Sequence, residues 1–325
     1  MTDTLPANSP MPCPPLPENI GSVQPGGGVC YQIELAWGRL RRAYLKRFRA
    51  GYVRRMARLR QGDLHGAPHE ILDPRDLKYC CNQCTAFWAA EHDPYRWRER
   101  LPFARWGLAE LQLMGWPLLA FGLLTFWLGG WWRLVAVVPA VMLGLIVYFF
   151  RDPRRTIPIE TDAIVAPADG TIAEVTPLDH DTFVAGPAVR IGIFLSIFNV
   201  HVNRAPRAAR VVAMHYKPGE FLNAINPESA LRNEFLWLGF EEPSGRRFAV
   251  RAISGLIARR IVCVLRPGKA VRRGEKFGMI KLGSRTELIL PRDTVEVAVA
   301  VGQKVQAGKT VLARYLENPE LNVES

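Results

Sequence analysis

The sequence lacks the marks of a secreted, disulfide-stabilised protein. Only six of its 325 residues are cysteine, and their spacing does not form a disulfide framework. The N-terminus has no basic segment followed by an apolar one, so we expect no cleavable secretory signal. We therefore expect reduced thiols and a cytoplasmic main domain.

Acidic residues are missing from one long stretch. Between Arg39 and Arg60 there are ten Lys or Arg and no Asp or Glu, in a chain with a formal charge of +12. Such a stretch is attracted to anionic lipid, although it could also neutralise nucleic-acid phosphates. Because the same chain has a hydrophobic block, the pattern favours a membrane partner and no nucleic acid.

The first hundred residues divide into a tail and an extension. Residues 1–29 hold seven prolines and end in three consecutive glycines and a valine, which predicts a disordered tail. Residues 30–110 form a basic, helical extension of unknown role. Within it, apolar residues recur every three or four positions, at Leu35, Leu40, Tyr44, Leu45, Phe48, Tyr52 and Met56. The spacing predicts an amphipathic helix or helix pair, either lying on a membrane or packed on the protein's own body.

Cys80, Cys81 and Cys84, with His92 nearby, raise the question of a zinc site. Only Cys81 and Cys84 have a ligand-like spacing, and the sequence has no second pair of ligands to complete a zinc site. We therefore expect structural or incidental cysteines and no metal.

Residues 111–150 form a hydrophobic block without a charged residue except Arg133. The runs 111–128 and 134–150 are each near the lower limit for a membrane-spanning helix. A hairpin of two short helices fits best, and a shallow re-entrant hairpin is the alternative. Basic residues flank both outer ends, so the positive-inside rule places the rest of the chain in the cytoplasm, at the inner membrane.

Residues 151–325 have the short β-type runs, separated by Gly and Pro, of a mainly β domain. Near the end, Gly268-Lys-Ala-Val-Arg-Arg-Gly274 resembles Gly302-Gln-Lys-Val-Gln-Ala-Gly308. Such turns link strands in β-sandwiches or barrels of the biotinyl/lipoyl type. We expect a mainly β catalytic domain of this kind, preceded by the α-hairpin and the basic extension.

Four residues of this domain are candidates for chemistry. Ser284 follows Gly283, whose lack of a side chain leaves its carbonyl open to attack by the serine, although a plain turn has the same sequence. Asp169 lies in an Asp-Gly turn, which also occurs for purely structural reasons. His201 ends an apolar strand, where a histidine can be a core residue or a general base. His215 follows in the next strand-like run.

Five motifs occur in a fixed order, and together they resemble the phosphatidylserine decarboxylase family. They are Phe149-Phe-Arg-Asp-Pro153, Ala166-Pro-Ala-Asp-Gly170, the segment from Phe194 to Pro206, His215-Tyr-Lys-Pro-Gly219 and Leu282-Gly-Ser-Arg285. The shorter archaeal-type branch is the closer likeness. The resemblance covers roughly residues 118–315 and leaves the first hundred residues as an added basic extension.

The resemblance implies a zymogen that cleaves itself between Gly283 and Ser284. Attack by Ser284 on the preceding carbonyl, followed by β-elimination and hydrolysis, would convert the serine into a pyruvoyl cofactor. The products would be a β chain of residues 1–283 and an α chain that starts at position 284. The pyruvoyl group would form a Schiff base with phosphatidylserine and act as an electron sink while CO₂ leaves, giving phosphatidylethanolamine.

The family uses an Asp-His-Ser arrangement for processing. Asp169 matches the acid, and His201 matches the first histidine of a His-x-x-His pair found in the longer bacterial branch. Arg204 replaces the second histidine here, so the base could be His201 or, as a fallback, His215. Arg151, Arg154 and Arg155 are candidates for binding the lipid head group, or they simply set the membrane topology.

Two other functions fit parts of the sequence. A non-catalytic, membrane-anchored adaptor of the lipoyl type would explain the repeated turns but not Asp169, His201 and Ser284. A membrane-tethered nucleic-acid binder is disfavoured because the β domain lacks interleaved aromatic and basic residues. A homo-oligomer is compatible with the sequence.

Overall fold

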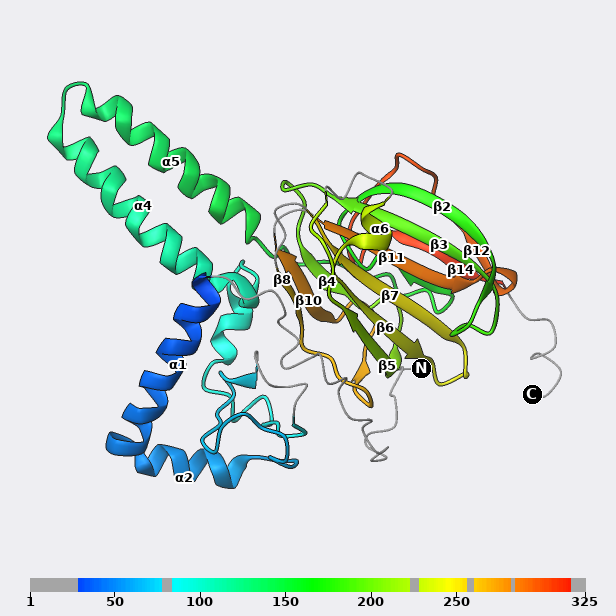
Figure 1. The fold of residues 1–325 in the computed structure, drawn as a ribbon, viewed down its shortest axis with the longest axis horizontal. Helices are drawn as coiled ribbons and strands as arrows, with labels where there is room; N and C mark the ends of the chain where they lie inside the picture. Colours follow the sequence, from blue (N-terminus) through cyan, green and yellow to red (C-terminus); the bar gives the residue numbers. More distant parts are fainter. Residues whose placement is uncertain (1–28, 78–83, 223–227, 256–259, 282–283, 317–325) are drawn as a thin grey trace. The chain divides into compact units, whose positions relative to one another are not determined.

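The computed structural model of the chain describes five segments, which are residues 29–77, 84–222, 228–255, 260–281 and 284–316 (Figure 1). They fall into two compact units. The helical unit contains residues 29–154 and 197–200, and the β unit contains residues 155–196 and 201–316. The predicted tail, Cys80, Cys81 and Gly283 lie outside the described residues.

Within its described residues, the helical unit contains four longer helices and two short 3₁₀ turns. These are α1 (Val29–Phe48), α2 (Ala50–Leu59), η1 (Arg96–Arg100), η2 (Arg105–Gly107), α4 (Leu108–Leu128) and α5 (Trp132–Phe149). The basic stretch therefore forms a helix pair that is interrupted at Arg49, whose backbone leaves the helical conformation.

The apolar side of α2 packs on the protein's own chain. Met56 is buried in a cluster with Leu72, Cys84, Ala86 and Trp88. The Trp88 indole N–H donates a hydrogen bond of 2.8 Å to the Met56 carbonyl and so joins α2 to the segment that contains Trp88. Cys84 is thus a core side chain, and the apolar side of α2 is not available to a membrane.

Helices α4 and α5 form an antiparallel hairpin whose surface is almost entirely apolar and exposed. Small residues allow the helices to approach, since a Cβ on Gly122 would lie 3.5 Å from the ring of Pro139. The Thr125 hydroxyl donates back to the Phe121 carbonyl at 2.9 Å, which satisfies it without water. By length and composition, residues 105–128 and 132–149 are both able to cross a membrane.

The base of the hairpin is closed by backbone hydrogen bonds. The Ala104 N–H donates to the Phe150 carbonyl at 2.8 Å, and the Asp152 N–H donates to the Pro102 carbonyl at 2.8 Å. Gly107 lies against the Phe150 ring so closely that an added Cβ would be 2.0 Å from it. The residues before α4 and after α5 are therefore held side by side.

The β unit confirms the prediction of a mainly β domain. Its largest sheet has eight strands in the order β13-β2-β3-β11-β7-β6-β5-β9. In chain order these strands are β2 (Gly170–Asp181), β3 (Gly186–Leu195), β5 (Ala209–Lys217), β6 (Phe235–Glu241), β7 (Arg247–Ser254), β9 (Ala270–Val271), β11 (Ser284–Pro291) and β13 (Lys304–Val305). The described strand pairs are all antiparallel.

Two three-stranded sheets complete the β unit. One has the order β1-β14-β12 and the other has the order β4-β10-β8. Their strands are β1 (Ala163–Val165), β4 (Val202–Arg204), β8 (Arg260–Cys263), β10 (Lys276–Lys281), β12 (Val295–Val297) and β14 (Val311–Tyr315). A single helical turn, α6 (Ser229–Arg232), and a 3₁₀ turn, η3 (Arg292–Thr294), lie between strands.

The two glycine repeats have the same local structure. All four repeat glycines, at positions 268, 274, 302 and 308, have positive φ angles between 72 and 87°. Each pair flanks a two-residue strand, β9 in the first repeat and β13 in the second. Glycine adopts such angles without the steric cost that other residues incur, so the repeat reflects a conformational requirement.

Candidate active site

Ser284 is the first residue of β11, in the middle of the large sheet. It pairs with Leu195 on β3 and with Ser254 on β7. The side chain is wholly buried, and within the described part of the chain its Oγ has no hydrogen-bond partner. A buried hydroxyl normally finds a partner, so an unsatisfied one calls for an explanation, and a chemical role is one such explanation.

Asp169 lies in the turn between β1 and β2, with both carboxylate oxygens occupied. Oδ1 accepts a hydrogen bond of 2.8 Å from the Ala307 N–H, and Oδ2 is 2.7 Å from the Arg155 guanidinium. The next residue, Gly170, approaches β3 so closely that an added Cβ would lie 2.2 Å from the Phe194 carbonyl oxygen. Since Leu195 pairs with Ser284, the turn carrying Asp169 lies at the same end of the sheet as the serine.

His201 is wholly buried directly before β4. Its carbonyl accepts a hydrogen bond of 3.3 Å from the Ile280 N–H, near the end of β10. Only residues 281–283 separate Ile280 from Ser284 in the chain. The backbone of His201 is therefore held beside the strand that leads into the serine.

Asn203 joins the acid's turn to the serine's strand. Its side-chain amide donates to the Thr286 hydroxyl at 3.3 Å and to the Pro167 carbonyl at 3.5 Å. Pro167 is two residues before Asp169, and Thr286 is two residues after Ser284 on the same face of β11. The sequence analysis missed Asn203, and only its position two residues after His201 could have indicated it.

His215 lies on the opposite face of the sheet from Ser284. On β5, His215 lies opposite Trp237 of β6. Trp237 lies opposite Arg251 of β7, and Arg251 lies opposite Glu287 of β11. Directly opposed residues share a face, whereas Glu287 and Ser284 are three positions apart on one strand and so face opposite sides. His215 is exposed there and lines an open pocket with Phe235, Trp237 and Arg251. The structure thus brings Asp169, His201 and Ser284 to one end of the sheet and leaves His215 apart.

Behind the serine, alternating charges cross the opposite face of the sheet. Arg285 lies 2.6 Å from Glu174 and 2.9 Å from Glu287, and Arg190 lies 2.8 Å from Glu174. Burial disfavours the charged form of Glu174, but the hydrogen bonds and charges of Arg285 and Arg190 outweigh it and lower the pKa of this carboxyl. The network fixes the strand that begins with Ser284.

Ser254 and Glu234 form a second polar group beside the serine, and the sequence analysis missed Ser254. The Ser254 hydroxyl donates to the Glu234 carbonyl at 3.0 Å, and the Asn233 amide donates to the Ser254 carbonyl at 2.7 Å. Burial raises the pKa of the Glu234 carboxyl to about 7, despite an opposing hydrogen bond of 3.3 Å from the Tyr216 hydroxyl. Glu234 thus contacts the residue that pairs with Ser284 through its backbone carbonyl, and its carboxyl contacts Tyr216.

The three arginines after the hairpin have different surroundings. Arg155 is bound to Asp169, as described above. Arg151 stacks 3.6 Å from the centre of the Tyr148 ring and donates to the Phe198 carbonyl at 2.8 Å. Arg154 is exposed. In the described segments, no group of three or more His, Cys, Asp or Glu side chains could hold a metal ion.

The fold is a mainly β domain with a buried serine at the start of a central strand. Comparison with known proteins gives its family. The family model for phosphatidylserine decarboxylase matches residues 142–313. A phosphatidylserine decarboxylase proenzyme of Rhodopirellula baltica is 49% identical over 243 residues, which cover 74% of this chain and 99% of that protein. The chain belongs to the phosphatidylserine decarboxylase family.

Other relatives agree. The phosphatidylserine decarboxylase proenzyme of Carboxydothermus hydrogenoformans is 43% identical over 206 residues, 61% of this chain and 93% of that protein. The proenzyme of Desulfotalea psychrophila is 44% identical over 170 residues, 52% of this chain and 79% of that protein. The family model begins at residue 142. Helices α1, α2 and α4 therefore lie outside it.

Proposed function

We propose that this chain is a proenzyme that becomes a phosphatidylserine decarboxylase, a carboxy-lyase that forms phosphatidylethanolamine and CO₂. The observation that carries the proposal is the wholly buried Ser284 Oγ, unsatisfied within the described residues, at the start of β11. A serine at this position, directly after a glycine, is suited to attack its own preceding carbonyl. The relatives are named proenzymes, which supports such a self-processing step in this chain.

Processing starts with the attack of the Ser284 Oγ on the carbonyl carbon of Gly283. The C–N bond breaks as the C–O bond forms, so the amide becomes an ester and the amine of residue 284 is released. Removal of the Cα proton then expels the carboxylate of residue 283 and leaves dehydroalanine. Addition of water and loss of ammonia give a pyruvoyl group at the new N-terminus. The products are a β chain of residues 1–283 and an α chain of residues 284–325.

His201 is the proposed base and Asp169 its acidic partner. His201 is held beside the end of β10, and Asp169 is held by Ala307 and Arg155 at the same end of the sheet. A histidine can accept the serine proton and later return it. His215, on the other face, is not assigned a role in this step.

The pyruvoyl group supplies a carbonyl that binds the substrate amine and withdraws electrons while the carboxylate leaves. The protein's own residues then exclude water and hold the proton that replaces CO₂. The Ser284 position suits this because both neighbouring strands cover it and its side chain is wholly buried. His201 is the proposed holder of that proton.

The substrate is a lipid, so the site must be reached from a bilayer. Helices α4 and α5 expose apolar side chains along most of their length, and we infer that they anchor the chain in the cytoplasmic membrane, with the β unit in the cytoplasm. Arg154 and Arg151 are proposed to attract the anionic head group. Arg155 contributes to the site by holding Asp169.

The alternative function, a non-catalytic lipoyl-like adaptor, is not favoured. The two glycine repeats are still proposed to be strand–turn units of the biotinyl/lipoyl type, because both hold a short strand between glycines with positive φ. An adaptor, however, needs no buried reactive serine. The proposed partners are phosphatidylserine, the two chains of the cleaved precursor and a second copy of the enzyme.

Denaturing electrophoresis with mass spectrometry tests the proposal. The purified wild-type protein should give two chains, with the 42-residue fragment of residues 284–325 blocked at its N-terminus. The Ser284→Ala variant should give one full-length chain without decarboxylase activity. Thr125→Ala is the matched control, because it removes another buried hydroxyl, in α4 and outside the proposed site. An intact wild-type chain that is active on phosphatidylserine would refute the processing route.

A further inference from the structure

Helix α1 presents its large apolar side chains outward. We call Ile33, Trp37, Leu40, Tyr44 and Phe48 the outer stripe of α1. These residues recur at spacings of three and four, which places them on one side of the helix. Their exposed fractions lie between 44 and 68%. A helix of a water-soluble protein normally turns such a side toward its core.

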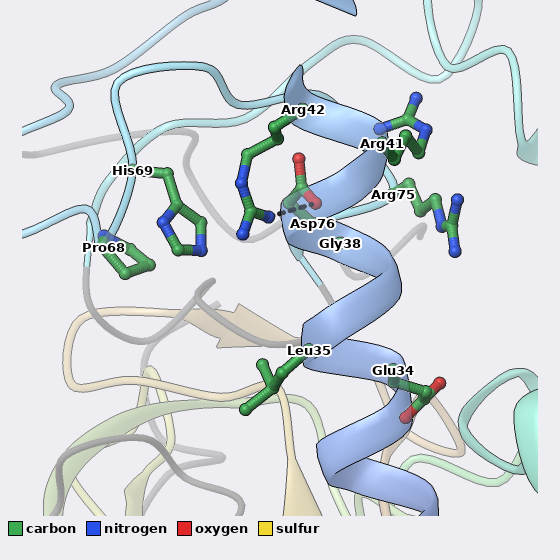
Figure 2. Close-up of a pocket in the computed structure, with 9 residues that line it drawn as sticks. All are labelled: Glu34, Leu35, Gly38, Arg41, Arg42, Pro68, His69, Arg75 and Asp76. Carbon is green, nitrogen blue, oxygen red and sulfur yellow. Dashed lines mark ion pairs between the residues drawn. The ribbon is translucent and has the colours of Figure 1, made fainter. Parts of the chain in front are cut away.

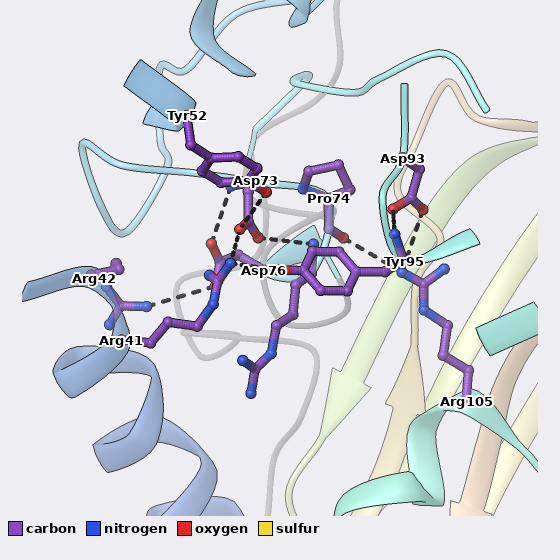
Figure 3. Close-up of polar contacts among 10 residues, drawn as sticks. Arg41, Arg42, Tyr52, Asp73, Pro74, Asp76, Asp93, Tyr95 and Arg105 are labelled. Atoms are coloured by element: carbon purple, nitrogen blue, oxygen red, sulfur yellow. Dashed lines mark hydrogen bonds and ion pairs between the residues drawn. The ribbon is translucent and has the colours of Figure 1, made fainter. Parts of the chain in front are cut away.

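The inward side of α1 carries the buried Leu45 and is joined to the protein by ion pairs. The Arg41 guanidinium pairs with the Asp73 carboxylate and lies 2.5 Å from the Tyr95 hydroxyl oxygen (Figure 3). Arg42 lies 3.7 Å from Asp76, an ion pair that Figure 2 draws. The orientation of α1 is therefore fixed by Arg41 and Arg42, which are bound to the protein.

The partners of α1 are themselves built into the unit. Asp73 opens the turn Asp73-Pro-Arg-Asp76, in which its carboxylate accepts the Arg75 N–H at 3.0 Å and Asp76 accepts the Asp73 N–H at 3.1 Å. The Tyr52 hydroxyl of α2 also donates to Asp73 at 3.2 Å. Breaking a buried pair of this kind would leave an uncompensated charge, so α1 cannot easily turn its stripe inward.

Exposed basic residues lie on the same helix as the outer stripe or directly after it. Arg39, Lys46, Arg47 and Arg49 are exposed, and no carboxylate pairs with them in the part of the chain that the structure describes. Three of the five stripe residues are aromatic, a composition typical of helices at the boundary between lipid and water. Apolar and aromatic side chains beside unpaired cations match an anionic phospholipid surface better than they match a protein surface.

We propose that the outer stripe of α1 is a second membrane-contacting surface, which lies in the head-group region of an anionic bilayer. Helix α1 contacts α4, the first helix of the hairpin, within the same unit. The stripe is thus attached to the element that enters the bilayer. Helix α2 is not part of this surface, because its apolar side is used by the protein's own core. The proposal shares with the proposed function only the premise that the hairpin lies in a membrane.

Photo-crosslinking of the full-length protein identifies what covers the stripe. The photoreactive residue p-benzoylphenylalanine replaces Leu40 in one variant and Tyr44 in a second. It replaces Val301, an exposed apolar residue of the β unit, in a matched control. Each variant is reconstituted in vesicles of equal parts phosphatidylcholine and phosphatidylglycerol, irradiated and analysed by mass spectrometry. We expect severalfold more lipid adduct at positions 40 and 44 than at position 301.

Any other outcome overturns the proposal. Adducts with a second copy of the chain, or with residues 1–28 of the same chain, would identify a protein as the occupant. Lipid labelling no stronger than at position 301 would mean that the stripe faces water. The same samples are run on a denaturing gel. Normal cleavage without lipid labelling contradicts only the α1 inference, and normal labelling without cleavage contradicts only the proposed function.

Discussion

Arg155 and Asp169 form a nearly buried ion pair, with the guanidinium Nη2 2.7 Å from the carboxylate Oδ2. The arginine belongs to the segment that follows the hairpin in the chain, and the aspartate opens β2. The second carboxylate oxygen accepts the Ala307 N–H, in the second glycine repeat. Two segments, one 14 residues before Asp169 and one 138 residues after it, thus hold the proposed catalytic acid in one orientation.

Replacing the acid should block maturation. Asp169→Asn keeps the size of the side chain but removes its charge, so we expect self-cleavage to slow by roughly 10²- to 10⁴-fold, the usual contribution of general acid–base catalysis. The measurement is the rate at which the full-length band disappears after synthesis. Asp179→Asn, at an exposed position of β2, should cleave at the wild-type rate. Equal rates for the two variants would contradict the role of Asp169.

The two histidines should respond differently. His201→Gln should abolish or strongly slow cleavage, because His201 is buried beside the strand that leads into Ser284. His215→Gln should cleave normally, because its side chain lies on the other face of the sheet. Time courses of cleavage for both variants check this. Loss of cleavage in His215→Gln alone would reverse the assignment of the base.

The base of the hairpin should not tolerate a side chain at Gly107. In Gly107→Ala the new Cβ would lie 2.0 Å from the Phe150 ring. We expect this variant to lose about 1–3 kcal/mol in its free energy of unfolding, as overpacked sites do. Gly51→Ala is the matched control, since no atom lies within 4 Å of its added Cβ. It should be neutral or slightly stabilising because alanine favours helix.

A double-mutant cycle locates the cause of that loss. Phe150→Leu trims the ring that Gly107 touches, so Gly107→Ala should cost less in that background than in the wild type. Unfolding of the detergent-solubilised protein, followed by circular dichroism, gives the four free energies. Strict additivity of the two substitutions would show that the ring is not the obstacle.

Glu234 should make stability depend on pH. Burial raises the pKa of its carboxyl from 4.5 to about 7 in the folded protein, so the folded state binds the proton more tightly than the unfolded state does. Its contribution to stability is therefore complete below pH 4.5 and is lost as the pH rises to about 7. The Glu234→Gln variant lacks this titration.

The wild type should lose stability relative to Glu234→Gln over that pH range. Urea unfolding of both proteins, at several pH values between 4.5 and 8, measures the difference. Glu296→Gln, at an exposed position of β12, should follow the wild type throughout. A constant difference between the wild type and Glu234→Gln would contradict the raised pKa.

The sequence predicted the elements well because their patterns are local. The uncharged runs before and after Arg133 predicted two helices, and α4 and α5 have nearly those bounds. Glycines at positions 268, 274, 302 and 308 predicted a repeated turn, and their positive φ angles are the physical reason for it. The mainly β character of residues 151–325 followed from the alternation of apolar residues with Gly and Pro.

The site was predictable only in part. Asp169, His201 and Ser284 are brought to one end of the sheet, but their proximity depends on β3 and β4 lying beside distant segments. Pairing between distant strands leaves no trace in a single sequence. For the same reason Asn203 and Ser254 were missed, and the face of the sheet that His215 occupies became known only from the register of four strands.

The location of the proposed cut within the sheet has a mechanical consequence. After cleavage, β11 still has β3 on one side and β7 on the other, and both belong to the larger chain. Strands β13 and β14 likewise remain paired with β2 and β1. The strands of the short chain therefore stay hydrogen-bonded to strands of the long chain, and the two chains can separate only by unfolding. The mature enzyme should behave in solution as one indivisible body, with its cofactor on a chain end that cannot leave.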